Sequence, residues 1–178
     1  MMDQIKEDLL LKEGKVLPLM EEFYSIQGEG YHTGKAAYFI RIGGCDVGCS
    51  WCDIKESWNR KLYPPTDTLK ITEHANQYPG KAVVVTGGEP LMYNLDFLCQ
   101  ELKAKNILRF LESSGAHPFS GDWSWICVSP KRNSPPVPSV YNKANELKVV
   151  IQTIEDFDWA EENAQIVSTL STLSEWRF

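Results

Sequence analysis

The chain has 178 residues, of which 43% are hydrophobic and 24% are charged, and its formal net charge is −6. This length and composition are typical of one soluble globular domain, so they exclude fibrous and disordered architectures. The 18 lysine and arginine residues are scattered, which argues against nucleic acid or an anionic membrane as a partner. No apolar run approaches the roughly 20 residues of a membrane helix, and the N-terminus lacks the pattern of a signal peptide. We therefore expect a cytoplasmic protein.

The first predicted elements are two strands separated by a glycine-rich loop. Residues 16–24 carry apolar side chains in loose alternation, and residues 37–42 form a β-branched and aromatic run. Residues 25–34 hold three glycines and few apolar anchors, which is typical of a loop whose backbone can approach a ligand closely. A segment rich in cysteine follows the second strand directly.

The rest of the chain alternates between predicted strands and helices. The three consecutive valines of residues 81–86 are typical of a parallel strand covered on both faces. The other predicted elements are helices over 66–77, 94–105 and 155–164, and strands over 107–111, 125–129, 147–151 and 165–168. Because polar and glycine residues collect just after the strands, we expect a parallel α/β sheet with a site at the carboxyl edge of its strands.

The five cysteines divide into a cluster and two isolated residues. Cys45, Cys49 and Cys52 have the spacing C-x3-C-x2-C, which indicates metal ligands and not a disulfide framework. Structural zinc normally takes four ligands, and the fourth is missing here, since the histidines are scattered. Cys99 and Cys127 lie in apolar elements and are interpreted as small buried hydrophobes. An iron–sulfur cube accepts three thiolates and leaves one iron open for another ligand.

This cysteine loop, with Trp51 before its last cysteine, resembles the radical S-adenosylmethionine (SAM) superfamily. The segment Thr86-Gly87-Gly88-Glu89-Pro90, after the valine strand, strengthens the resemblance. It implies an α/β fold, an abbreviated radical SAM partial (β/α) barrel with a mostly parallel sheet, as a single domain over residues 1–178 with its cluster loop at 43–58. It also implies a [4Fe-4S] cluster on the three clustered cysteines. The SAM-binding residues implied are Trp51, Thr86, Gly87, Gly88, Glu89, Ser113, Ser129 and Lys131, although the two serines and the lysine are also ordinary turn residues.

Within the superfamily, three further segments resemble the 7-carboxy-7-deazaguanine synthases of the pathway to queuosine and other 7-deazapurines. They are residues 23–30, which contain the string SIQGEG, the residues Phe39-Ile40-Arg41, and residues 52–58. The resemblance implies 6-carboxy-5,6,7,8-tetrahydropterin as substrate. Gln27 and Glu29 suit the guanidine-like edge of a pterin, and Arg41 suits its carboxylate. The implied substrate-binding residues are Ile26, Gln27, Gly28, Glu29, Gly30 and Arg41.

The activity implied is that of a carbon–nitrogen lyase. An electron cleaves SAM to a 5′-deoxyadenosyl radical, which takes hydrogen from C6 of the pterin. Ring contraction, return of the hydrogen and loss of ammonia give 7-carboxy-7-deazaguanine, and SAM is recycled. The resemblance further implies a homodimer and an external low-potential electron donor, with neither nucleic acid nor a membrane as partner.

The sequence departs from this family at two places. Ile54 stands where members commonly have a Thr ligand to Mg²⁺, so a magnesium ion is expected to bind more weakly here. The sequence ends at Glu175-Trp176-Arg177-Phe178, where relatives continue with a substrate-contacting segment. Either the pocket closes differently, or the sequence as given lacks its C-terminal tail.

Two other classes of function stay open at this point. A radical-generating activase would act on a large partner protein through a broad docking face and would not bind a pterin. A zinc-stabilised binding module would contain zinc and no iron. Measuring iron, sulfide and zinc separates the module from the two enzymes, and offering the carboxypterin separates the enzymes from each other.

Overall fold

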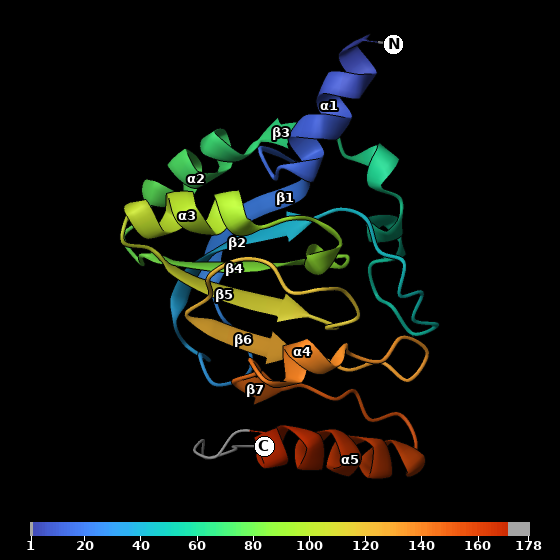
Figure 1. The fold of residues 1–178 in the computed structure, drawn as a ribbon. Coiled ribbons are helices and arrows are strands. Elements are labelled where there is room, and N and C mark those ends of the chain that lie inside the picture. The colour runs from blue at the N-terminus through green and yellow to red at the C-terminus, as the bar shows by residue number, and fades with distance from the viewer. Residues whose placement is uncertain (1, 171–178) are drawn as a thin grey trace.

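The computed structural model describes residues 2–170 and contains one seven-stranded sheet, which Figure 1 shows face-on. The strands are β1 (Val16–Ile26), β2 (Ala36–Ile42), β3 (Pro65–Asp67), β4 (Ala82–Gly87), β5 (Leu108–Ser113), β6 (Trp125–Val128) and β7 (Glu146–Leu147). Their order is β3-β1-β2-β4-β5-β6-β7. β1 runs antiparallel to β2 and β3, and all other neighbours are parallel. This open, mostly parallel sheet confirms the predicted partial barrel.

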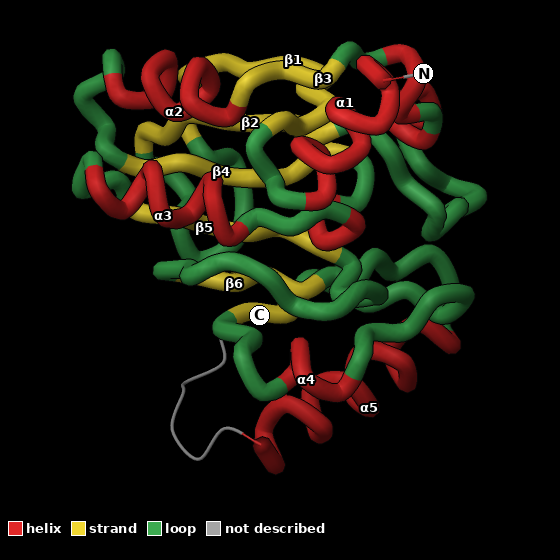
Figure 2. Tube along the Cα trace, turned by 45° about the horizontal axis from the view of Figure 1, so that its top comes forward, coloured by secondary structure: helices red, strands yellow, loops and turns green. Residues whose placement is uncertain are grey.

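The helices lie mainly on one face of the sheet and at its two ends. They are α1 (Met2–Lys12), α2 (Thr68–Asn76), α3 (Asp96–Ala104), α4 (Pro138–Tyr141) and α5 (Glu155–Leu170), with 3-10 turns η1 (Lys55–Trp58), η2 (Arg60–Leu62) and η3 (Pro90–Met92). α2 and α3 lie side by side across one face, and α5 lies beyond β7 (Figures 1 and 2). Among the described residues, no helix has the length and apolar character needed to cross a membrane.

The sheet buries side chains on both faces, because successive residues of a strand point in opposite directions. On the helix face, Val83 and Val85 pack in the larger core together with Leu98 and Leu102 of α3. On the opposite face, Val84 packs in a smaller core with Ala37, Phe39, Ala82 and Phe110. The run of three valines therefore occupies a strand covered on both faces, as predicted.

Two predicted strands differ from the structure. The strand predicted over 147–151 is β7, which begins at Glu146 and ends at Leu147. Among the described residues it pairs with β6 alone, and β6 ends at Val128, whose carbonyl accepts from the Lys148 N–H at 2.9 Å. Beyond this point Val150 and Ile151 are exposed. Residues 165–168 are not a strand but belong to α5, because Val167 packs into the core from that helix and no glycine or proline interrupts it.

Helix α1 and strand β3 were not predicted. β3 has only three residues and exists because it pairs with residues 16–18 of β1. Where prediction and structure agree, short polar side chains mark the helix starts: Asp67 caps α2 by accepting from the Leu69 N–H at 2.9 Å. The residues at which the given sequence ends, Glu175–Phe178, fall outside the described residues, so the expectation about a C-terminal tail stays a prediction.

Candidate active site

The cluster loop leaves the carboxyl end of β2 and is fixed to the fold by its own backbone. The Gly44 N–H donates to the Ser57 carbonyl at 2.6 Å, and the Gly44 carbonyl accepts from the Glu89 N–H at 2.8 Å. A side chain at Gly88 would place its Cβ 2.1 Å from the Gly44 carbonyl oxygen. The second glycine of the Gly87-Gly88 pair is therefore required by the close approach of two backbones, one of which begins the cluster loop.

All three clustered cysteines are half-buried thiols. Burial raises the pKa of Cys45, and the backbone N–H groups of Val47 and Gly48 act in the opposite direction. Burial also raises the pKa of Cys49, opposed by the positive charge of Lys131. Backbone N–H groups and a nearby cation are partners that stabilise a thiolate over a thiol.

The thiols fit a cluster better than a single metal ion. Within residues 2–170, no three His, Cys, Asp or Glu side chains are arranged to hold one ion. In a four-iron cluster each thiolate binds a different iron, so three separated sulfurs on one loop are what the cluster needs. The residues present therefore fit a [4Fe-4S] cluster with one open iron.

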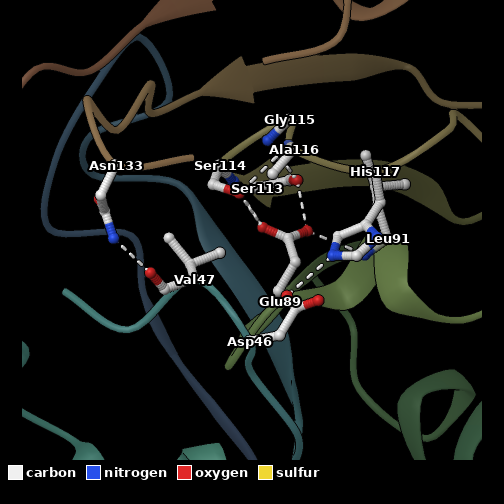
Figure 3. Close-up of polar contacts among 10 residues, drawn as sticks. All are labelled: Asp46, Val47, Glu89, Leu91, Ser113, Ser114, Gly115, Ala116, His117 and Asn133. Carbon is white, nitrogen blue, oxygen red and sulfur yellow. Dashed lines mark hydrogen bonds and ion pairs between the residues drawn. The ribbon is translucent and has the colours of Figure 1, made fainter. Parts of the chain in front are cut away.

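The carboxylate of Glu89 organises the strand ends beside this loop (Figure 3). Its side chain is only 1% exposed and accepts hydrogen bonds from the Leu91 N–H at 2.9 Å, the Ser113 hydroxyl at 2.6 Å and the Ser114 N–H at 2.8 Å. The Ser114 hydroxyl also donates to it. Glu89 thus joins the carboxyl ends of β4 and β5, and it holds Ser113 in place as part of that junction.

A groove of about 370 Å³ lies between the cluster loop and the loop that follows β6. Its lining includes Cys49, Trp51 and Lys131. The Lys131 ammonium sits 5.1 Å from the centre of the Trp51 ring and donates to the Ser129 hydroxyl at 2.5 Å. Two residues predicted to bind SAM, Trp51 and Lys131, therefore line one groove beside the cluster cysteines, and a third, Ser129, contacts Lys131.

Polar residues form a row across the opposite face of the sheet from the helices. Arg41 pairs in register with Thr86, Glu112 with Cys127, and Cys127 with Glu146. The Thr86 hydroxyl approaches the Glu112 carboxylate at 3.4 Å, which joins the two halves of the row. Each of the five parallel strands contributes one residue, and we call this set the polar row.

The glycine-rich loop at 27–35 is tied to the polar row by charge. The Gln27 amide donates to Glu112 at 2.8 Å, and Glu29 pairs with the Lys148 ammonium at 2.8 Å. Lys148 also lies 3.6 Å from Glu112. Burial alone would lower the pKa of Lys148, but the two carboxylates outweigh it and the pKa is raised. Lys148 thus stays charged between two acidic groups.

Aromatic stacking closes the same loop over the sheet. The His32 ring stacks on Phe110 at 4.1 Å between centroids, and the Tyr31 ring stacks on Trp125 at 4.4 Å. Burial, followed by the charge of Lys35, lowers the pKa of His32. The space enclosed beneath the loop is only about 20 Å³, which is room for about one water molecule.

The residues predicted to bind the substrate do not all line the space beneath the loop at 27–35. Gln27, Glu29 and Gly30 line the enclosed space, whereas Ile26 is 65% exposed. Arg41 faces the same side of the sheet and lies 2.9 Å from Glu21, with its guanidinium over the Phe23 ring.

Sequence reasoning gave no role to several residues that line the enclosed space. These are His32, Phe110, Glu112, Trp125, Glu146 and Lys148, together with Cys127, which was interpreted only as a buried hydrophobe. Cys127 is indeed buried, at 7% exposed. A period-two pattern that switches from apolar to polar at the strand ends, as from Phe110 to Glu112, is the signal that would have located the row.

Comparison with known proteins agrees with this geometry. Residues 39–158 match the family model of the radical SAM superfamily. A 7-carboxy-7-deazaguanine synthase of Flavobacterium psychrophilum is 57% identical over 94% of this chain and 81% of its own length. The synthase of Synechocystis is 46% identical over 89% of this chain and 78% of its own length.

A solved structure shows the same fold. The crystal structure of QueE from Escherichia coli superimposes with a TM-score of 0.77 at 29% sequence identity, covering 95% of this chain and 82% of that one. The cysteine loop, the Gly-Gly turn beneath it and the extent of these matches lead to one conclusion. The chain belongs to the 7-carboxy-7-deazaguanine synthase family of the radical SAM superfamily.

Proposed function

We propose that this chain converts 6-carboxy-5,6,7,8-tetrahydropterin to 7-carboxy-7-deazaguanine at the polar row. As a member of its family it is a radical SAM lyase that uses a [4Fe-4S] cluster and SAM. The observation that carries the proposal is the contact of Gln27 and Glu29 with Glu112 and Lys148. It places the most characteristic sequence string of the family on a row of strand ends that leads directly into the cluster loop.

Each half of the site has a separate task. When bound, the cluster and SAM supply a radical that takes hydrogen from C6 of the pterin. Cys45, Cys49 and Cys52 hold the cluster, while Trp51, Ser129 and Lys131 bind SAM in the adjoining groove. The backbone of Thr86, Gly87 and Gly88, at the end of β4, contacts SAM as well. Glu89 holds the end of β4 in place, and Ser113 fixes the end of β5.

The other half binds the substrate. Glu112, with Gln27 and Glu29, accepts hydrogen bonds from the guanidine-like edge of the pterin, and Arg41 pairs with its carboxylate. The backbone of Ile26, Gly28 and Gly30 shapes the loop above the ring. The space beneath the loop at 27–35, about 20 Å³, is small for a pterin, so the proposal includes a shift of this loop or of its side chains to admit the substrate. Closure of the loop over the bound substrate excludes water from the radical.

Three further features belong to the proposal. A homodimer and an external low-potential electron donor are proposed by resemblance to the family. Magnesium is expected to bind weakly, because Ile54 offers only its backbone carbonyl, which already accepts from the Ser57 N–H at 3.0 Å and the Ser57 hydroxyl at 2.7 Å. The Ile54→Thr variant should therefore show a stronger dependence of activity on Mg²⁺ than the wild type, measured as rate against magnesium concentration.

The test is a reconstituted reaction. Reduced protein with iron, sulfide and SAM should convert the carboxypterin to the deazaguanine with many turnovers for each SAM consumed. Gln27→Ala and Glu29→Ala should raise KM for the pterin at least tenfold and leave the Kd for SAM unchanged. Stoichiometric SAM cleavage without the deazaguanine would favour the activase, and bound zinc without iron would favour the binding module.

A further inference from the structure

The first turn of the cluster loop, between Cys45 and Cys49, is held from outside by two side chains (Figure 3). The Asn133 amide, in the loop after β6, donates to the Val47 carbonyl at 2.5 Å. The His117 ring, in the loop after β5, lies 2.8 Å from the Asp46 carboxylate. Two consecutive residues of this turn are therefore fixed from two different strand ends.

Of the two contacts, the bond from Asn133 bears more directly on the cluster cysteines, because it engages the peptide between Val47 and Gly48. The peptide that carries the Val47 carbonyl also carries the Gly48 N–H, and in a trans peptide these two groups point in opposite directions. The Gly48 N–H is one of two backbone N–H groups, with that of Val47, that lower the pKa of Cys45 against the larger effect of burial. A donor that fixes the carbonyl on one side thus fixes the N–H on the other.

The turn depends on such a restraint. Gly48 has a φ of +68°, so its backbone occupies the left-handed region, and nothing lies within 4 Å of the position that a Cβ would take. Glycine rotates more freely than any other residue, because it has no side chain to restrict its backbone. The side chain of Val47 is buried, at 5% exposed. Among the hydrogen bonds of the described residues, the bond from the Asn133 amide is the one that restrains the Val47 carbonyl.

We propose that Asn133 is a positioning residue that aims the Gly48 N–H at the Cys45 thiolate and so raises the reduction potential of the cluster. Hydrogen bonds to the sulfurs stabilise the reduced, more negative form of an iron–sulfur cluster. In other metal sites, mutation of a residue that hydrogen-bonds to a metal ligand and orients it typically lowers metal affinity by about 10–100-fold. The inference rests on the proposed role of Cys45 as a cluster ligand and adds a function for a residue outside the cysteine motif.

The test compares three variants, whose potential and iron loss are measured without SAM and whose Kd for SAM is measured separately. Asn133→Leu keeps the size of the side chain, removes the donor and adds no charge, whereas Asn133→Gln retains an amide donor. Asn142→Leu makes the same change at a position in the turn after α4. Redox titration followed by electron paramagnetic resonance gives the midpoint potential, and loss of iron to a chelator gives the stability of the cluster.

Asn133→Leu should shift the midpoint potential to a more negative value and lose iron about tenfold faster than the wild type. Asn133→Gln should recover part of both effects, and Asn142→Leu should match the wild type. An unchanged potential with a weakened Kd for SAM would overturn the inference and make Asn133 a residue of the SAM groove only. A wild-type chain that reconstitutes no cluster would overturn the proposed function as well.

Discussion

The five cysteines fall into two environments that determine their chemistry. Cys99 and Cys127 are buried, and burial raises the pKa of each to about 12. At pH 8 only about one in 10⁴ of such thiols is ionised, and the thiolate is the reactive form. The clustered cysteines are only half-buried, and the rise in pKa that burial causes is opposed by backbone N–H groups at Cys45 and by Lys131 at Cys49. A thiol reagent should therefore distinguish the two groups.

We expect iodoacetamide at pH 8 to label the three clustered cysteines of the metal-free protein long before Cys99 and Cys127. Because thiolate increases with pH, any labelling of these two should rise about tenfold for each pH unit. Peptide mass spectrometry after timed quenching measures the rates, and denatured protein, in which all five should react, is the control. Labelling of Cys127 as fast as that of the cluster cysteines would show that its thiol is not buried in the folded protein.

At the scale of elements, the loop at 27–35 depends on one crowded glycine. Gly30 has a φ of +73°, and a Cβ there would lie 2.3 Å from the Glu146 carboxylate, which also accepts from the Tyr31 N–H at 3.2 Å and the Trp125 indole at 2.8 Å. Gly30→Ala should push the loop off Glu146. We expect KM for the pterin to rise about tenfold, equivalent to about 1.4 kcal/mol, with the Kd for SAM unchanged.

Gly34→Ala is the matched control for this prediction. Gly34 has a φ of +87°, so an alanine there carries similar backbone strain, but nothing lies within 4 Å of its Cβ. The difference in KM between the two variants isolates the contact with Glu146. Equal effects in both variants would mean that backbone strain, and not this contact, positions the loop.

The same loop shows where sequence reasoning reached its limit. The cysteine spacing and the Gly-Gly turn were readable because each lies within a few consecutive residues. Glu29 and Lys148 are 119 positions apart, and Gln27 and Glu112 are 85 positions apart. Their contacts depend on strand order and register, which local patterns do not determine. Strand β3 could not be predicted for a similar reason, because its three residues form a strand only through pairing with β1.

At the scale of the whole molecule, the core and the cluster loop are built independently. Neither hydrophobic cluster of the described residues contains Cys45, Cys49 or Cys52. The loop is anchored by bonds that need no metal, including the Tyr93 hydroxyl on the Gly43 carbonyl at 2.8 Å. Removing the cluster should therefore leave the sheet intact and lower the free energy of unfolding only by the amount that the bound cluster contributes.

We expect the chelator-stripped protein to keep the far-ultraviolet circular dichroism of the reconstituted protein and to melt about 5–10 °C lower, as a loss of about 2–3 kcal/mol predicts for a chain of this size. Both samples are kept anaerobic, so that oxidation of the thiols does not contribute. A variant with serine at positions 45, 49 and 52 is the matched control, because it cannot hold the cluster. Its Tm should equal that of the stripped wild type whether or not iron and sulfide are added. Loss of the secondary-structure signal on stripping would contradict this and would mean that the sheet folds around the cluster.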